Sequence, residues 1–127
     1  MSWESKYFTS EEMACKCGCG QEKMNPEFMA RLTDLREFFG KPMAVTSGYR
    51  CPEHPIEARK SKLGAHTYGQ AVDIAVQGTA GYEFVKAVME HGEIKRVGVQ
   101  QKGKNRFVHL DSMTDGLGFP SPWVYSY

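Results

Sequence analysis

The chain has 127 residues, of which 41% are hydrophobic and 24% charged, and this composition predicts one globular domain over residues 1–127. Its 16 basic and 15 acidic side chains are mixed along the chain and leave a formal net charge of +1, which argues against a nucleic-acid-binding surface. No apolar run comes near the roughly 18 residues that a membrane span requires, so we expect no membrane insertion.

Two helices are expected first along the chain. Residues 8–13 carry a helix-start signal, because Thr9 can cap the first turn and Glu12 follows three residues later. Residues 26–39 are expected to form the main core helix, since apolar side chains recur there at helical spacing and Gly40 ends the pattern.

The rest of the chain predicts short strands, a loop and one more helix. Residues 51–65 hold two prolines and a glycine, which favours a surface loop with one helical turn after the first proline. A further helix, the second of the two long ones, is expected near 79–91, and the tail has room for a short edge strand at 123–125. The expected strands are 43–47, 70–76, 95–100 and 106–111, the last two joined as a hairpin. Together these elements predict an α+β fold, a small and mainly antiparallel sheet with two helices covering one face.

Two histidines and an aspartate stand out as candidate metal ligands. His66 precedes Asp73 by seven residues, with Gly69 between them, and His109 lies on a later strand. In both strands the polar side chain alternates with large apolar residues, so it points away from the apolar face. A catalytic zinc site needs about three nitrogen or oxygen ligands from the protein and one open position. The alternative is a set of ordinary hydrogen-bonded or solvated polar residues.

Three short blocks of sequence carry a family resemblance. They are Ser-Gly-Tyr-Arg-Cys-Pro-Glu-His at 47–54, His-Thr-Tyr-Gly-Gln-Ala-Val-Asp-Ile at 66–74 and Phe-Val-His-Leu-Asp at 107–111. Together they resemble the signature of the zinc D-alanyl-D-alanine carboxypeptidase family. That family includes phage endolysins that cut the L-alanyl-D-glutamate bond, and its fold is shared with the hedgehog signalling domain. The resemblance runs over nearly the whole chain, from Phe8 to Tyr127.

The resemblance implies a role for each matching residue. His66, Asp73 and His109 would hold Zn²⁺, and Arg50 would stabilise the oxyanion or hold a substrate carboxylate. A planar, permanently charged guanidinium suits either task. Without a metal site, Arg50 would be read as part of an ordinary surface salt bridge.

The first block also supplies candidate substrate contacts. Ser47 and Tyr49 flank the glycine of the same block as Arg50, and we expect them to bind substrate. His54 and Glu53, in the following loop, are weaker candidates for a substrate contact or for the general base, and His54 could instead cap or hydrogen-bond its own loop.

Two positions depart from the family pattern. Gly64 stands where many members have a serine, and Arg106 stands where several relatives have an acidic general base. Asp111 is therefore our candidate base, because it shares a strand face with His109 and lies roughly 7 Å along the strand. Its alternative role is to orient the ligand histidine.

Four cysteines form a separate feature. Alternate spacing would place three thiols on one side of an extended chain, and the fourth could complete a structural zinc site. Zinc knuckles usually have two residues between cysteines, so free thiols are the default expectation. A zinc knuckle that binds nucleic acid is disfavoured by the near-neutral charge. The cysteines are Cys15, Cys17, Cys19 and Cys51.

We therefore expect a monomeric zinc metallopeptidase that hydrolyses peptide bonds in bacterial peptidoglycan stem peptides. The D-Ala-D-Ala carboxypeptidase and L-Ala-D-Glu endopeptidase types both remain open. The alternative is a non-catalytic cell-wall-binding or phage structural module with the same fold. The N-terminus lacks the apolar segment of a signal peptide, so we expect synthesis in the cytoplasm and action on the wall after release, or within a phage particle.

Overall fold

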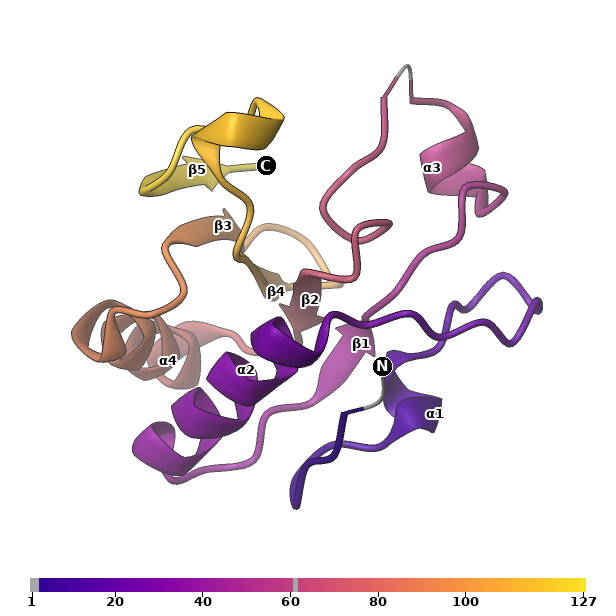
Figure 1. Ribbon diagram of the computed structural model, residues 1–127. Helices are drawn as coiled ribbons and strands as arrows, with labels where there is room; N and C mark the ends of the chain where they lie inside the picture. The colour runs from indigo at the N-terminus through magenta and orange to yellow at the C-terminus, as the bar shows by residue number, and fades with distance from the viewer. Residues whose placement is uncertain (1–2, 61) are drawn as a thin grey trace.

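An open β-sheet with strand order β1-β2-β4-β3-β5 lies at the centre of the computed structural model, which describes residues 3–60 and 62–127 (Figure 1). Neighbouring strands pair antiparallel, except that β3 and β5 pair parallel. The strands are β1 (Val45–Ser47), β2 (Ala71–Ile74), β3 (Arg96–Gln100), β4 (Phe107–Asp111) and β5 (Trp123–Ser126). The expected α+β class with a mainly antiparallel sheet is confirmed.

The first two helices begin at the capping signals in the sequence. Thr9 and Glu12 form a reciprocal capping box at the first helix. The Asn25 side chain accepts a hydrogen bond from Phe28 N at the start of the main core helix, and Gly40 ends that helix with a φ of 74°. The helices are α1 (Ser10–Met13), α2 (Pro26–Phe39), α3 (Pro55–Ala58), α4 (Gly78–His91) and the 3₁₀ turn η1 (Asp115–Leu117).

The hydrophobic core lies between the sheet and the pair α2 and α4. These two helices run beside one another on the same side of the sheet (Figure 1). Phe28 of α2 and Phe84 of α4 are fully buried, as are Val72 and Leu110 of the central strands. Full burial of each such side chain stabilises the fold by about 1.5–3 kcal/mol. The prediction of two helices covering one face is confirmed.

The other face of the sheet carries a row of polar side chains at one level. Ser47 pairs with Asp73, Asp73 with His109, His109 with Gly98, and Gly98 with Tyr125. Directly paired residues project from the same face of a sheet, and they alternate here with the buried apolar positions. The strand pairing therefore places in one row residues that lie as far apart in the sequence as Ser47 and Tyr125.

Several elements differ slightly from the expectation. The strands β1 and β2 are shorter than predicted, and the helical turn begins at Pro55, where the His54 side chain caps it, rather than directly after Pro52. The edge strand in the tail exists and pairs with β3. Among the described residues, no helix is long and apolar enough to pass through a bilayer.

Candidate metal centre

Three side chains converge on the polar face of the sheet. His66, Asp73 and His109 each offer one ligand atom, and these atoms all lie within 4.8 Å of one another. Asp73 Oδ1 is 3.4 Å from His66 Nε2 and 2.9 Å from His109 Nδ1. The three residues are buried, with no more than 6% of any one exposed. The residues singled out from the sequence thus form one compact cluster.

His66 is held by the loop that precedes β2. Gly69 has a φ of +73°, and a Cβ there would lie 2.1 Å from the Lys23 carbonyl oxygen, so the loop requires glycine. His66 Nδ1 lies 2.7 Å from the Gly48 carbonyl oxygen. A carbonyl can only accept, so Nδ1 carries the hydrogen and Nε2 keeps its lone pair toward Asp73.

His109 is oriented by a buried ion pair between Asp111 and Arg96. Its Nε2 lies 2.7 Å from Asp111 Oδ2, and Asp111 Oδ1 accepts hydrogen bonds from Arg96 Nε at 2.8 Å and from Met113 N at 3.1 Å. Asp111 is only 1% exposed. His109 therefore donates from Nε2 to Asp111 and turns Nδ1 toward the other two ligands. This geometry favours the orienting role of Asp111 over the role of general base.

Burial and hydrogen bonding set the charges of the cluster. Burial acts to raise the pKa of Asp73, but hydrogen bonds with His109 and His66 outweigh it and hold that pKa well below its usual range. Burial lowers the pKa of His66. Burial also acts to lower the pKa of His109, but hydrogen bonds with Asp111 and Asp73 outweigh it and raise that pKa. Asp73 and His66 are thus shifted toward their metal-binding forms, whereas His109 is shifted toward its protonated form, with which a metal ion would compete.

The donor set fits a catalytic zinc ion. Two imidazole nitrogens and one carboxylate oxygen are ligands that zinc prefers, and three protein ligands leave a fourth position for water or substrate. The second hydrogen bond of each histidine, to Gly48 O or to Asp111, fixes the tautomer that ligation needs.

Arg50 lies directly beside this cluster. Its guanidinium donates to Asp73 Oδ2 at 3.4 Å and to Glu57 Oε2 at 3.3 Å, and its Nε donates to Ser47 Oγ at 3.2 Å. The Arg50 side chain is 13% exposed, so a bound molecule can still reach it. Ser47, predicted to contact substrate, thus also holds the arginine in place, and its contact with substrate stays a prediction.

Glu57 is a buried carboxylate at the site that the sequence analysis missed. It accepts hydrogen bonds from Lys60 Nζ at 3.0 Å and from Thr67 Oγ1 at 3.2 Å, in addition to that from Arg50. Burial acts to raise its pKa, but Lys60 and Arg50 outweigh burial and lower it. Nothing in the loop composition marked Glu57 over Glu53, because its burial depends on how α3 folds back toward Arg50.

Tyr125 is a second residue that the sequence did not reveal. Its ring centroid lies 6.0 Å from that of His109. A Cβ on Gly98 would lie 2.6 Å from the Tyr125 ring, so the missing side chain at this position of β3 makes room for the tyrosine. The edge strand β5 thereby brings an aromatic hydroxyl to the metal-ligand face.

The two other predicted substrate contacts have structural partners. Tyr49 is 4% exposed and belongs to the hydrophobic core cluster. His54 Nδ1 accepts a hydrogen bond from Ile56 N at 3.1 Å and caps α3, which was the alternative role. Their contact with a substrate stays a prediction.

The two positions that depart from the family pattern lie in different surroundings. A Cβ on Gly64 would lie 2.7 Å from Lys60 Nζ and 3.0 Å from Glu57 Oε1, so a serine there would require the end of the flexible Lys60 side chain to shift. Arg106 Nε donates to the Gly103 carbonyl at 3.0 Å within the β3–β4 hairpin.

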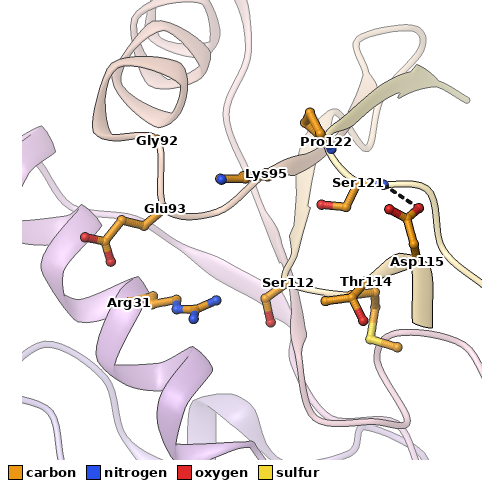
Figure 2. A pocket seen from close by; sticks show the side chains of 10 residues that line it. Arg31, Gly92, Glu93, Lys95, Ser112, Thr114, Asp115, Ser121 and Pro122 are labelled. Carbon is orange, nitrogen blue, oxygen red and sulfur yellow. Dashed lines mark hydrogen bonds between the residues drawn. The ribbon is translucent and has the colours of Figure 1, made fainter. Parts of the chain in front are cut away.

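A polar cavity of about 510 Å³ lies elsewhere, between α2, the loop after α4 and the segment 112–122 (Figure 2). Of the described residues that line it, none is a candidate ligand. Its charged side chains are largely solvated. The cavity is thus separate from the metal centre. Its lining consists of Arg31, Gly92, Glu93, Lys95, Ser112, Met113, Thr114, Asp115, Ser121 and Pro122.

Comparison with known proteins agrees with this geometry. Residues 6–111 match a family model described as peptidase M15. The match covers most of the chain and includes Arg50 and the three candidate ligands. A search of curated proteins found no match. The family resemblance seen in the three sequence blocks is confirmed, and the chain belongs to the peptidase M15 family.

Proposed function

We propose that this protein is a zinc-dependent peptidase that hydrolyses peptide bonds in the stem peptides of bacterial peptidoglycan. The observation that carries the proposal is the convergence of His66, Asp73 and His109, with correctly directed nitrogen atoms, in a chain of the peptidase M15 family. Arg50 adds a fixed positive charge beside these ligands.

Several residues have distinct roles in the proposed hydrolysis. Bound zinc would polarise the scissile carbonyl and lower the pKa of a water molecule. Arg50 is positioned to donate to the developing oxyanion, or to a carboxylate of the substrate, without a change of its own charge. Asp111 holds His109 in the tautomer that presents Nδ1, and Gly48 does the same for His66 Nε2.

The surroundings of the site favour a substrate that carries carboxylates. A cavity of about 370 Å³ is lined by Phe119 and by four residues of the segment that precedes His66 in the sequence, Lys60, Lys62, Leu63 and Gly64. Lys62 Nζ lies 5.0 Å from the centre of the Phe119 ring, and Arg50 stands at the ligands. Stem peptides are short and rich in free carboxylates, which is the chemistry that such cations bind.

Digestion of purified peptidoglycan tests the proposal. The expected result is the release of new amino groups, which stops with a chelator and returns with added zinc. Mass spectrometry of the products then identifies the bond, since loss of a terminal alanine differs from cleavage before glutamate. A protein that binds the wall but releases no product in the presence of zinc would overturn the proposal and favour the non-catalytic module.

Replacement of Asp111 by asparagine is expected to lower peptidase activity by about 10- to 100-fold. An asparagine amide has one accepting oxygen, but Asp111 accepts from Arg96 and Met113 N on one side and from His109 on the other. The amide NH₂ would then face either the donors Arg96 and Met113 N or His109 Nε2. In the second case Nε2 has to accept, so the ring hydrogen moves to Nδ1, the atom that the metal needs. Activity and zinc content of the Asp111→Asn variant measure this effect.

The pH profile separates the two roles of Asp111. A residue that only orients His109 leaves the shape of the pH profile of kcat/KM unchanged and lowers zinc affinity. A general base contributes the acidic limb of that profile, so disappearance of this limb in Asp111→Asn would contradict the orienting role. Asp115→Asn, in the exposed 3₁₀ turn η1, is a matched control with wild-type activity expected.

A further inference from the structure

The four cysteines of the chain come together at one place, apart from the three-ligand cluster. One sulfur atom from each lies within 4.8 Å of all the others. Cys51 Sγ is 3.7 Å from Cys15, 3.4 Å from Cys17 and 3.6 Å from Cys19, and the sulfur atoms of Cys15 and Cys17 are 3.4 Å apart. Cys15 and Cys51 are buried, whereas the other two are exposed.

These distances match a shared metal ion better than they match disulfides. A disulfide requires sulfur atoms about 2.05 Å apart. A tetrahedral zinc site with Zn–S bonds of about 2.3 Å places its sulfur atoms about 3.8 Å apart. One sulfur, that of Cys51, lies at nearly the same distance from three others, and a pair of disulfides would not produce this arrangement.

The local backbone explains how cysteines with one intervening residue can converge. Gly18 and Gly20 have φ values of +100° and +72°, so the chain turns back after each of the last two cysteines of the run. Cys15 N donates to the Gln21 carbonyl at 2.8 Å and closes the loop. The usual spacing of at least two intervening residues argued against a zinc site, but the positive φ values at these glycines let cysteines with one intervening residue converge.

Backbone hydrogen bonds point at two of the sulfur atoms. Cys51 N donates to Cys15 Sγ at 3.3 Å, and Gln21 N donates to Cys19 Sγ at 3.4 Å. Peptide N–H donors around a cluster of sulfur atoms stabilise thiolates rather than thiols, because they favour the charged acceptor.

We propose that Cys15, Cys17, Cys19 and Cys51 bind a structural zinc ion, distinct from the metal centre of the peptidase site. Four thiolates in tetrahedral arrangement are a donor set for zinc or iron–sulfur chemistry, and they leave no open position for a substrate. The ion therefore has a structural role and takes no part in hydrolysis.

This zinc site connects the N-terminal segment to the catalytic block. Cys51 directly follows Arg50, and Tyr49 N donates to the Met13 carbonyl at 2.8 Å. A Cβ on Gly48, whose carbonyl holds His66, would lie 2.9 Å from Met13 Cα. The zinc ion thus holds together two segments, one around Met13 and one around Gly48 and Tyr49. The contact between them positions Arg50 and fixes the tautomer of His66.

Metal analysis and zinc X-ray absorption on the full chain test the proposal. The protein is prepared with zinc and reductant as wild type, as His109→Ala and as Cys17→Ser/Cys19→Ser. We expect two zinc ions per wild-type chain. His109→Ala should retain about one zinc with four sulfur neighbours at about 2.3 Å. The double serine variant should lose the sulfur neighbours and keep nitrogen and oxygen neighbours at about 2.0–2.1 Å.

Stability gives a second measurement. Removal of the structural ion should lower the Tm by about 10 °C or more, because its binding free energy contributes to folding. Lys16→Ala, in the same loop with all thiols present, should keep both zinc ions.

Three results would overturn the proposal: His109→Ala with no sulfur-bound zinc, iron in place of zinc, or a disulfide among the four cysteines by mass spectrometry under reducing purification. His109→Ala changes no cysteine, so the proposal can be tested even if the serine variant does not fold. The experiment measures metal coordination, so its result is valid even if the protein hydrolyses no peptidoglycan.

Discussion

Replacement of His109 by alanine is expected to remove the catalytic metal and lower peptidase activity by at least about 100-fold. The variant leaves only His66 and Asp73 as ligands. Even the loss of a residue that only hydrogen-bonds to a metal ligand lowers metal affinity or activity by about 10- to 100-fold. The fold should persist, because Asp111 keeps its 2.8 Å hydrogen bond with Arg96. Release of amino groups from peptidoglycan, zinc content and thermal melting measure the effect.

His91→Ala is the matched control for this experiment. His91 lies in the last turn of α4, where its ring packs at 5.4 Å from that of Phe38, on the helical side of the sheet. Its loss should leave zinc content and activity unchanged. Wild-type hydrolysis by a folded His109→Ala variant would contradict the three-ligand site itself.

Replacement of Arg50 is expected to lower activity by roughly 100- to 1000-fold, the usual cost of losing one donor to an oxyanion. Arg50→Ala removes the charge, whereas Arg50→Lys keeps it and loses the planar fork that donates to both Asp73 and Glu57. The lysine variant should therefore recover only part of the activity. Steady-state kinetics with a defined stem peptide measures both variants.

The kinetic constants distinguish the two roles of Arg50. A drop in kcat with little change in KM indicates a contact made to the oxyanion in the transition state. A rise in KM with kcat preserved indicates that Arg50 binds a carboxylate of the substrate. Arg59→Ala, at the exposed end of α3, is the control from the same loop. Unchanged kinetics in Arg50→Ala would remove the arginine from the mechanism.

Local patterns were sufficient for most of the fold. The Asn25 cap and Gly40 end bound α2 as expected, because capping depends on hydrogen bonds within a few residues. Alternation along β2 and β4 correctly separated Val72 and Leu110 from Asp73 and His109, because side chains alternate between faces in any strand. The assignment of these polar residues as zinc ligands stays a prediction, now with a geometry that fits it.

Contacts between distant segments were beyond such patterns. The burial of Glu57 beside Arg50 depends on the path of a loop, and the approach of Tyr125 to His109 depends on a parallel edge strand and a missing side chain at Gly98. Asp111 was correctly placed on the face of His109. The residue that forms an ion pair with Asp111 is Arg96, which lies on the neighbouring strand and could not be identified from the sequence spacing.

The sequence by itself determined the helices, the strand faces, the family and the residue types available for a metal, since each follows from neighbours in the chain or from short motifs. The tertiary structure alone decided which of these residues meet. It grouped Asp73 and His109 through strand pairing, held His66 beside them through the loop before β2, and joined Cys51 to a cysteine run more than thirty residues earlier. The reason is physical: metal ligation and ion pairing need atoms within a few ångströms, and only packing of the whole chain sets those distances.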